Sequence, residues 1–143
     1  MSALPAGYHL TDDPAHIDAE AAHAYLSGSY WSPGIALATV QRAIANSWCA
    51  AIVHGGAQVG FARLITDRAT FAWLADVHVL EGHRGRGLAR ALVLYFQNHP
   101  ELQDLRRWGL STLDAHALYR ELGWTKPSQP ERFMERLFPE AGR

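Results

Sequence analysis

The chain has 143 residues, which is enough for one domain with a single substantial core. Apolar residues make up 48% and charged residues 19%, as in globular proteins and unlike disordered ones. The formal net charge of −1 gives no general attraction to nucleic acid or anionic membranes, and no apolar run is as long as a membrane span. A single cysteine excludes an intrachain disulfide and suits a reducing compartment. We therefore expect a cytoplasmic protein that binds neither nucleic acid nor membrane.

One strand and two helices are predicted in the first third of the chain. Residues 8–11 can form a short strand, and Asp13-Pro14 is typical of an N-cap followed by the first residue of a helix. The side chains expected on one face of that helix are Ile17, Ala21, Ala24 and Tyr25. A loop over residues 27–34, rich in glycine and serine, separates it from a second helix that ends at Asn46-Ser47.

Three strand-like runs follow in the middle of the chain. The first two, residues 48–54 and 58–65, are joined by Gly55-Gly56, a pair typical of a hairpin turn. A polar turn then leads into the third run, residues 70–80. The pattern predicts a hairpin followed by a third strand.

Helices and strands alternate in the rest of the chain. A helix is expected over residues 88–98 and a strand over residues 105–112. The next helix would have Asp114 as its N-cap and Gly123 as its C′ residue. A last strand is expected over residues 133–138. Elements in this order predict an α/β or α+β fold, in which helices pack on the faces of a sheet.

A glycine-rich turn joins the third strand-like run to the helix that follows it. Its sequence is Arg84-Gly85-Arg86-Gly87-Leu88-Ala89. Free amides and the helix dipole favour an anion at a helix N-terminus, and glycines let the backbone approach it closely. Two other phosphate-binding loops do not fit, because a P-loop lysine is absent and the third small residue of a dinucleotide loop falls on Arg90. The turn therefore predicts a site for a phosphorylated cofactor.

The spacing Arg84-x-x-Gly87-x-Ala89 resembles the acetyl-CoA pyrophosphate loop of the GNAT N-acetyltransferase superfamily, whose pattern is Gln/Arg-x-x-Gly-x-Gly/Ala. Val79 lies five residues before the arginine, as in the family. Residues 115–124 resemble the family's A-x-x-L-Y-x-x-x-G-F helix. Two motifs in this order are far more specific than either alone.

This resemblance extends over about residues 8–138 and implies one acyl-CoA N-acyltransferase-like domain, residues 1–143. The implied fold is a single mixed, mostly antiparallel central sheet flanked by about four helices. The implied reaction moves the acetyl group of acetyl-CoA, the co-substrate, to a primary amine by direct transfer in a ternary complex. The amine acceptor is not identified by the sequence. Relatives often pair, so a homodimer is one further expectation.

Particular residues acquire roles through the same resemblance. Backbone amides of the turn would hold the pyrophosphate, and they belong to Arg84, Gly85, Arg86, Gly87, Leu88 and Ala89. Val77 and Val79 would pair with the pantetheine arm like another strand, with the Val77 N–H facing the thioester oxygen. Tyr119 falls where the family commonly places the tyrosine that protonates the leaving thiolate. Without the resemblance, Tyr119 would be interpreted as a core residue whose hydroxyl has a partner.

The general base is left open between two residues and a water relay. Asp76 is a lone carboxylate in an apolar strand, where burial would raise its pKa. It could equally be a structural residue tied to backbone amides or to an arginine. His78 shares its strand face and titrates in a useful range, although a lone strand histidine is more often structural. Trp73 stands where many relatives carry a glutamate base, which leaves room for a water relay.

Three residues are candidates for contacts with the acceptor. Tyr30 and Trp31 lie in the loop that shapes the acceptor pocket in the family, where they could form an aromatic platform or simply anchor the loop. Arg63 could recognise a polar group of the acceptor, or be solvated. Cys49 is interpreted as a small core residue and not a nucleophile. The histidines lack the spacing of a metal site, so no metal is expected.

Two other functions compete with acetyl transfer. A non-catalytic acyl-CoA-binding or sensing module would need the turn at residues 84–89 but not Tyr119. A nucleic-acid-binding protein would use the arginines, but the near-neutral net charge argues against it.

Overall fold

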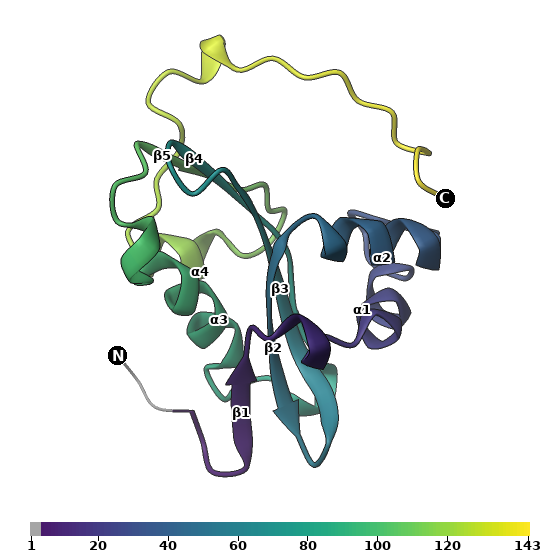
Figure 1. The fold of residues 1–143 in the computed structure, drawn as a ribbon. Coiled ribbons are helices and arrows are strands. Elements are labelled where there is room, and N and C mark those ends of the chain that lie inside the picture. The colour runs from purple at the N-terminus through teal and green to yellow at the C-terminus, as the bar shows by residue number, and fades with distance from the viewer. Residues whose placement is uncertain (1–3) are drawn as a thin grey trace.

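The computed structural model describes residues 4–143 and contains one five-stranded sheet with helices on both faces (Figure 1). The strands are β1 (Tyr8–Thr11), β2 (Trp48–His54), β3 (Ala57–Thr66), β4 (Phe71–Val79) and β5 (Arg107–Gly109). The helices are α1 (Ala19–Leu26), α2 (Leu37–Ala45), α3 (Leu88–Gln97) and α4 (His116–Glu121). Single 3-10 turns occur at Pro14–His16, Glu81–His83, Pro100–Leu102 and Pro130–Arg132.

The strands lie in the order β1-β2-β3-β4-β5. Each neighbouring pair from β1 to β4 is antiparallel, and β5 is parallel to β4. The sheet is therefore mixed and mostly antiparallel, which confirms the expected fold class. The β2–β3 hairpin turns at Gly55-Gly56, where both glycines have positive φ angles, +58° and +79°.

Each face of the sheet is covered by a pair of helices (Figure 1). On one face, α1 and α2 pack around Phe61 of β3, which is fully buried. On the other face lies the larger core, to which α3 contributes Leu88, Leu92, Val93 and Phe96. Full burial of one such side chain stabilises the fold by about 1.5–3 kcal/mol. None of the helices within residues 4–143 combines the length and the apolar character needed to cross a bilayer.

The first predicted helix is divided into two pieces. Asp13 caps only the 3-10 turn Pro14–His16, and α1 begins later, where the Asp18 carboxylate accepts a hydrogen bond from Ala21 N at 3.0 Å. The expected helical face is wrong in part. Ile17 and Tyr25 pack against the core as expected, but Ala24 is exposed, and Ala22 and Leu26 are the buried residues of α1. A second capping carboxylate so close to the first was the signal that the sequence interpretation overlooked.

Two boundaries in the second half also differ from expectation. β5 is much shorter than residues 105–112, because its pairing with β4 stops at Gly109. The N-cap of α4 is Ala115, with no side-chain cap among the described residues, so Asp114 does not have the expected role. Gly123 follows the C-cap of α4 with φ +95°, which confirms it as the C′ residue.

The strand expected over residues 133–138 is absent from the structure. Residues 125–143 instead form an extended segment, the C-terminal arm, in which every residue is exposed. The arm arches over the end of the sheet and reaches the side of α2 (Figure 1). Its tip is held there because Gly142 O accepts hydrogen bonds from Ala36 N (2.9 Å) and Thr39 Oγ1 (3.0 Å). The strand prediction was wrong because no strand among residues 4–143 lies beside the arm.

Candidate functional site

β4 and β5 separate after a short paired stretch. The pairs run from Phe71–Arg107 to Trp73–Gly109, and the rest of β4 has no partner strand on this side among residues 4–143. Gly109 marks the point of separation, since a Cβ there would lie 2.8 Å from the ring of Trp73. We call this opening between the strands the split. Unpaired backbone along one side of β4 is available to a ligand that can mimic a strand.

A β-bulge lies in β4 beside the split. Phe61 pairs with His78 and Arg63 with Ala75, so two residues of β4 oppose the single residue Ala62 of β3. Asp76 occupies the bulge with φ +59°, a conformation that aspartate tolerates better than most residues. The bulge turns the Asp76 carboxylate toward the layer of α1 and α2.

The Asp76 carboxylate is held by two side chains. Arg63 Nε donates to Asp76 Oδ2 at 2.8 Å, and Trp31 Nε1 donates to Asp76 Oδ1 at 3.0 Å. Arg63 also donates to Ser47 Oγ at 3.2 Å. The arginine and aspartate side chains are only 17% and 11% exposed. Both residues are therefore engaged with each other, in the structural arrangement that the sequence had left as one alternative for Asp76.

His78 is buried next to the bulge, with 6% of its surface exposed. Its Nδ1 lies 2.8 Å from Asp76 O. Because a carbonyl oxygen only accepts, Nδ1 carries the proton and Nε2 keeps a free lone pair. The Tyr25 ring stacks on the imidazole at 4.1 Å, and burial lowers the pKa of His78 below its ordinary value. The imidazole is therefore neutral at neutral pH.

The turn at residues 84–89 leads from β4 into α3 at the open end of the split. Gly85 and Gly87 both have φ +77°, and a Cβ at either position would meet no atom of residues 4–143 within 4 Å. Gly87 is the N-cap of α3, whose first amides receive no side-chain cap in this part of the chain. Open space in front of uncapped amides, close to exposed Arg86, fits an anion.

Arg84 links this turn to β4 and to α1. Its Nε donates to Val79 O at 3.0 Å, and its Nη2 donates to Tyr25 OH at 3.0 Å. The same Tyr25 ring covers His78. The first residue of the turn is thus connected through one tyrosine to the imidazole beside the bulge.

Tyr119 lies in α4, and its ring packs against that of Trp124 with the centroids 5.8 Å apart. It is 8% exposed, and its hydroxyl has no hydrogen-bond partner among residues 4–143. Burial of the phenol and, to a smaller extent, the nearby Tyr30 raise the pKa of Tyr119 to about 12. Tyr30 OH accepts a hydrogen bond from Leu113 N at 2.9 Å, which joins the loop to the segment after β5. Tyr119 therefore keeps its proton at any physiological pH.

The structure links Arg63, Trp31 and His78 to Asp76 at the bulge, and it links Arg84 to His78 through Tyr25. We call Val77, Val79, residues 84–89 and Tyr119 the loop half of the site. We call Tyr30, Trp31, Arg63 and Asp76, together with Tyr25, the aromatic half. The sequence interpretation did not assign Tyr25 or the Leu113 amide to the site. Tyr25 had been placed on the core face of its helix, and only the packing of α1 against β4 shows its contacts.

Other candidate groups lie outside this arrangement. Cys49 is buried, which confirms it as a core residue, and burial raises the pKa of its thiol to about 12. Within residues 4–143 no three His, Cys, Asp or Glu side chains gather as a metal site requires. A cavity of about 510 Å³ lies between the start of β2 and the end of α3, lined by Trp48, Arg68 and His99 among others. None of its lining residues belongs to β4, to the turn or to α4.

Comparison with known proteins identifies the family of this chain. The model of the acetyltransferase (GNAT) domain family matches residues 44–126, which is more than half of the chain. The match includes β4, the turn and α4. The chain belongs to the GNAT acetyltransferase family. Among curated proteins, the Gibberella zeae protein named "Putative acetyltransferase FG08082" is 28% identical, covering 81% of this chain and 78% of its own.

Solved structures support the same GNAT assignment. A protein from Xanthomonas campestris pv. campestris, described as a putative acetyltransferase of the GNAT family, is 46% identical with a TM-score of 0.92. That comparison covers 97% of this chain and 98% of the other. Glucosamine-6-phosphate N-acetyltransferase from Arabidopsis thaliana is 12% identical with a TM-score of 0.66, covering 92% of this chain and 98% of the other. The latter similarity concerns the fold alone.

Proposed function

We propose that this GNAT protein transfers the acetyl group of acetyl-CoA directly to a primary amine. The observation that carries the proposal is the turn at residues 84–89, with its uncapped amides at the open end of the split. An anion-binding helix N-terminus next to unpaired strand backbone suits a ligand with a phosphate end and an amide-bearing arm.

The pyrophosphate of acetyl-CoA would lie on the amides of the turn. Gly85 and Gly87 leave space where other residues would place a Cβ. Arg84 and Arg86 supply positive charge at this point. Because Arg84 bonds Tyr25 and Val79 within the chain, Arg86 is the exposed cation proposed to contact the phosphates.

The pantetheine arm would extend from the turn into the split. There it would pair with backbone groups of Val77 and Val79, which lie beyond the last β4–β5 pair. The bulge at Asp76 reorients the following amide, and we propose that the Val77 N–H donates to the thioester oxygen. An aimed donor of this kind lowers the barrier of acyl transfer by roughly 3 kcal/mol in other enzymes.

Tyr119 would supply the proton for the leaving group. The amine nitrogen attacks the thioester carbon, the C–N bond forms, and the C–S bond breaks to release the thiolate of CoA. The phenol of Tyr119 has no hydrogen-bond partner among residues 4–143 and a raised pKa, so it is protonated and available to that thiolate. Loss of such an acid typically costs at least about 10²-fold in rate.

His78 would take the proton that the amine must lose. It is neutral, and its Nε2 lone pair is free because Nδ1 is engaged with Asp76 O. Tyr25 covers the ring and 6% of the residue is exposed, so we propose that a water carries the proton from the amine to His78. Asp76 is not proposed as the base, since Arg63 and Trp31 bind its carboxylate.

The acceptor would approach over the aromatic half. Tyr30 and Trp31 are 51% and 38% exposed, and their rings form an edge contact at 5.0 Å. The Trp31 N–H is fixed on Asp76, which holds this ring beside the bulge. Exposed aromatic faces attract a cationic amine before it is deprotonated.

Two measurements on the purified chain test the proposal. The first is thermal unfolding with and without acetyl-CoA, and the second is release of CoA thiol with a panel of alkylamines, peptide N-termini and peptide lysines. We expect stabilisation by acetyl-CoA and thiol release that depends on one class of amine. Stabilisation without any amine-dependent release would instead favour an acyl-CoA-binding module. If acetyl-CoA produced neither stabilisation nor thiol release, both functions would be rejected.

A further inference from the structure

Tyr25 of α1 contacts three separate parts of the candidate site. Its ring stacks on the imidazole of His78, with the centroids 4.1 Å apart and the planes 2° from parallel. Its hydroxyl accepts a hydrogen bond from Arg84 Nη2 at 3.0 Å. The centroid of its ring also lies 6.2 Å from that of Trp31, within the range of an aromatic contact. One side chain therefore connects the proposed base, the first residue of the turn and the platform proposed for the acceptor.

The packing of α1 fixes where Tyr25 lies. Ala22 and Leu26 are the buried residues of this helix, and α1 and α2 together cover one face of the sheet (Figure 1). Because residues three apart share a helix face, Tyr25 lies beside Ala22 at the edge of that buried face. The tyrosine is half-buried against the same small core that contains Phe61. Its ring therefore belongs to the packed layer between α1 and the sheet.

The imidazole of His78 is held from three directions. Its Nδ1 lies 2.8 Å from Asp76 O, and the ring of Phe61 lies 5.7 Å away at a tilt of 38°. Of these three neighbours, only Tyr25 comes from outside the sheet. The ring torsion of a histidine has a broad range, so one hydrogen bond at Nδ1 does not by itself fix the plane of the ring. A parallel ring at 4.1 Å does, and it thereby fixes the direction of the Nε2 lone pair.

Tyr25 also determines the surroundings that set the pKa of His78. Burial has the largest effect and lowers this pKa, the charge of Asp76 raises it, and the charge of Arg84 lowers it. The Tyr25 ring supplies part of the burial. Its hydroxyl holds Arg84, which is tied to the end of β4 by its other bond, from Nε to Val79 O at 3.0 Å. Loss of the ring would therefore expose one face of the imidazole.

We propose that Tyr25 is a positioning residue for acetyl transfer: its ring fixes the direction of His78 Nε2, and its hydroxyl ties the turn at residues 84–89 to the same imidazole through Arg84. The inference rests on the proposed function, in which His78 receives the proton of the amine. Tyr25 itself exchanges no proton and forms no bond with the substrates. Since the two contacts belong to different atoms of one side chain, they can be removed separately.

Tyr25→Phe removes only the contact with the turn. The variant keeps the stacked ring but loses the hydrogen bond from Arg84. We expect the dissociation constant for acetyl-CoA to rise about fivefold, which corresponds to the loss of one hydrogen bond. The titration of His78 should be nearly unchanged, because the imidazole remains covered.

Tyr25→Leu removes both contacts. We expect kcat to fall at least about tenfold, because the imidazole is no longer held in one orientation. The pKa of His78 should rise toward 6.5, since water reaches the open face of the ring. The acid limb of kcat should move to higher pH by the same amount.

Three measurements on the full chain follow these effects. NMR of protein with ¹³C-labelled histidine gives the titration of His78 without turnover, and the His78→Gln variant identifies its signal. Titration calorimetry gives the acetyl-CoA dissociation constant, and CoA thiol release gives kcat as a function of pH.

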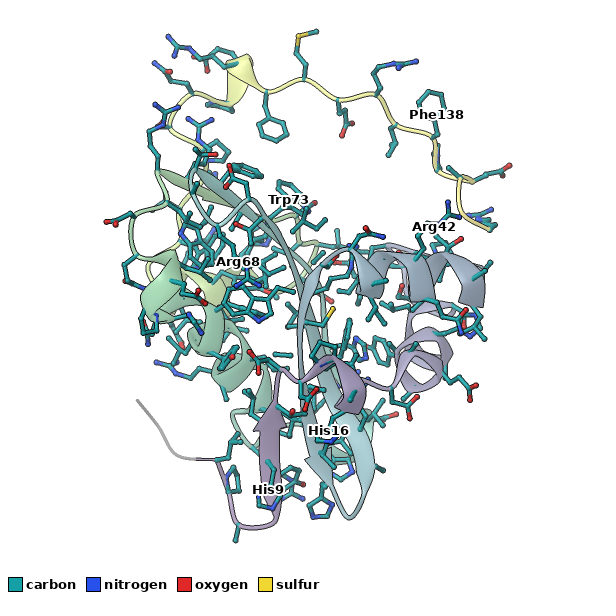
Figure 2. All side chains as sticks on the ribbon, in the orientation of Figure 1. His9, His16, Arg42, Arg68, Trp73 and Phe138 are labelled. Carbon is teal, nitrogen blue, oxygen red and sulfur yellow. The ribbon has the colours of Figure 1, made fainter. Side chains whose placement is uncertain are left out.

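The matched control is Trp48→Leu. The Trp48 ring likewise contacts a histidine and an arginine, with its centroid 4.6 Å from that of His99 and 3.9 Å from Arg68 Cζ. Figure 2 shows Arg68 on the α3 side of the sheet, whereas α1, which carries Tyr25, covers the other side. Trp48→Leu should lower the unfolding free energy but change neither the titration of His78 nor the affinity for acetyl-CoA.

The outcomes separate this inference from the proposed function. An unchanged His78 titration and kcat in Tyr25→Leu would overturn the orienting role, as would equal changes in Trp48→Leu. An unchanged acetyl-CoA dissociation constant in Tyr25→Phe would overturn the connection to the turn. Failure of the proposed function would instead appear in the wild type, as an acid limb of kcat that does not coincide with the titration of His78. That result would reject His78 as the base and this inference with it.

Discussion

The two halves of the site are built in different ways. The loop half uses mainly backbone groups, with glycines at positive φ and amides at the start of a helix. The aromatic half uses side chains from α1, from the loop that follows it, and from β3 and β4. Backbone sites need particular residues at fixed spacing, whereas side-chain sites depend on which distant segments meet. We infer that the loop half serves the shared cofactor and the aromatic half the particular acceptor.

The largest effect should come from the loop half. Gly87→Val places a branched side chain in a left-handed conformation, in the space proposed for the pyrophosphate. Loss of two amide–phosphate bonds at about 2 kcal/mol each would weaken acetyl-CoA binding about 10³-fold. Titration calorimetry with acetyl-CoA measures the change.

The matched control for that variant is Gly56→Val. Its φ of +79° is close to that of Gly87, and a Cβ there also meets no described atom within 4 Å. Both variants should lose similar amounts of unfolding free energy, about 1–2 kcal/mol from backbone strain. Only Gly87→Val should lose acetyl-CoA affinity. Equal acetyl-CoA affinities in the two variants would show that the turn does not bind the cofactor.

The next effect concerns the proton donor. Tyr119→Phe should lower kcat about 10²-fold or more and leave the unfolding free energy nearly unchanged, because the hydroxyl has no partner in residues 4–143. Steady-state thiol release and urea unfolding measure the two quantities. Tyr95→Phe provides the opposite pattern, since Tyr95 OH donates to Asp12 Oδ2 away from the split. It should lose about 1 kcal/mol of stability and keep its kcat.

His78 tests the connection between the two halves. His78→Gln should lower kcat by roughly 10²-fold. In the wild type, burial lowers the pKa of His78 below 6.5, so the rate should fall at acid pH as the imidazole becomes protonated. The variant should lack this acid limb, which a pH series of kcat measures. His116→Gln, an exposed histidine of α4, should leave the profile unchanged.

The same lowered pKa of His78 affects stability. The native state favours the neutral imidazole, so this contribution to the unfolding free energy is complete above about pH 6.5 and is lost as the pH falls through the lowered pKa. Urea unfolding of His78→Gln should therefore depend less on pH below 6.5 than that of the wild type. An identical pH dependence would show that His78 is not buried in the neutral form.

The smallest effect should come from the ion pair of the aromatic half. Asp76→Asn keeps a residue that tolerates φ +59° but removes the charge opposite the buried Arg63. We expect a loss of about 2 kcal/mol in unfolding free energy. Glu121→Gln breaks the exposed pair with Arg90 and should cost less than about 0.5 kcal/mol. Equal losses of unfolding free energy in the two variants would mean that the Arg63–Asp76 pair does not stabilise the bulge.

The same division explains what could be predicted from the sequence. The turn at residues 84–89 and the helix that starts after Gly87 could be predicted from the sequence, because a glycine turn and the start of a helix each depend on a few adjacent residues. The roles of Arg63 and Tyr25 depend on contacts across the sheet, which periodicity does not show. Residues 133–138 have the pattern of a strand, but a strand forms only beside a neighbouring strand, and none of the strands within residues 4–143 lies beside them. Asp114 does not cap α4, since the N-cap is Ala115, whose N–H donates to Thr112 Oγ1 at 3.0 Å.

The most direct test of the loop half is a titration of ¹⁵N-labelled protein with acetyl-CoA, followed by amide chemical shifts. We predict large shifts for Gly85, Gly87 and the first amides of α3, with further shifts at Val77 and Val79. Acetyl-pantetheine, which lacks the phosphates, should move the Val77 and Val79 amides but not those of the turn. Shifts centred on the cavity beside Trp48, with an unchanged turn, would contradict the account.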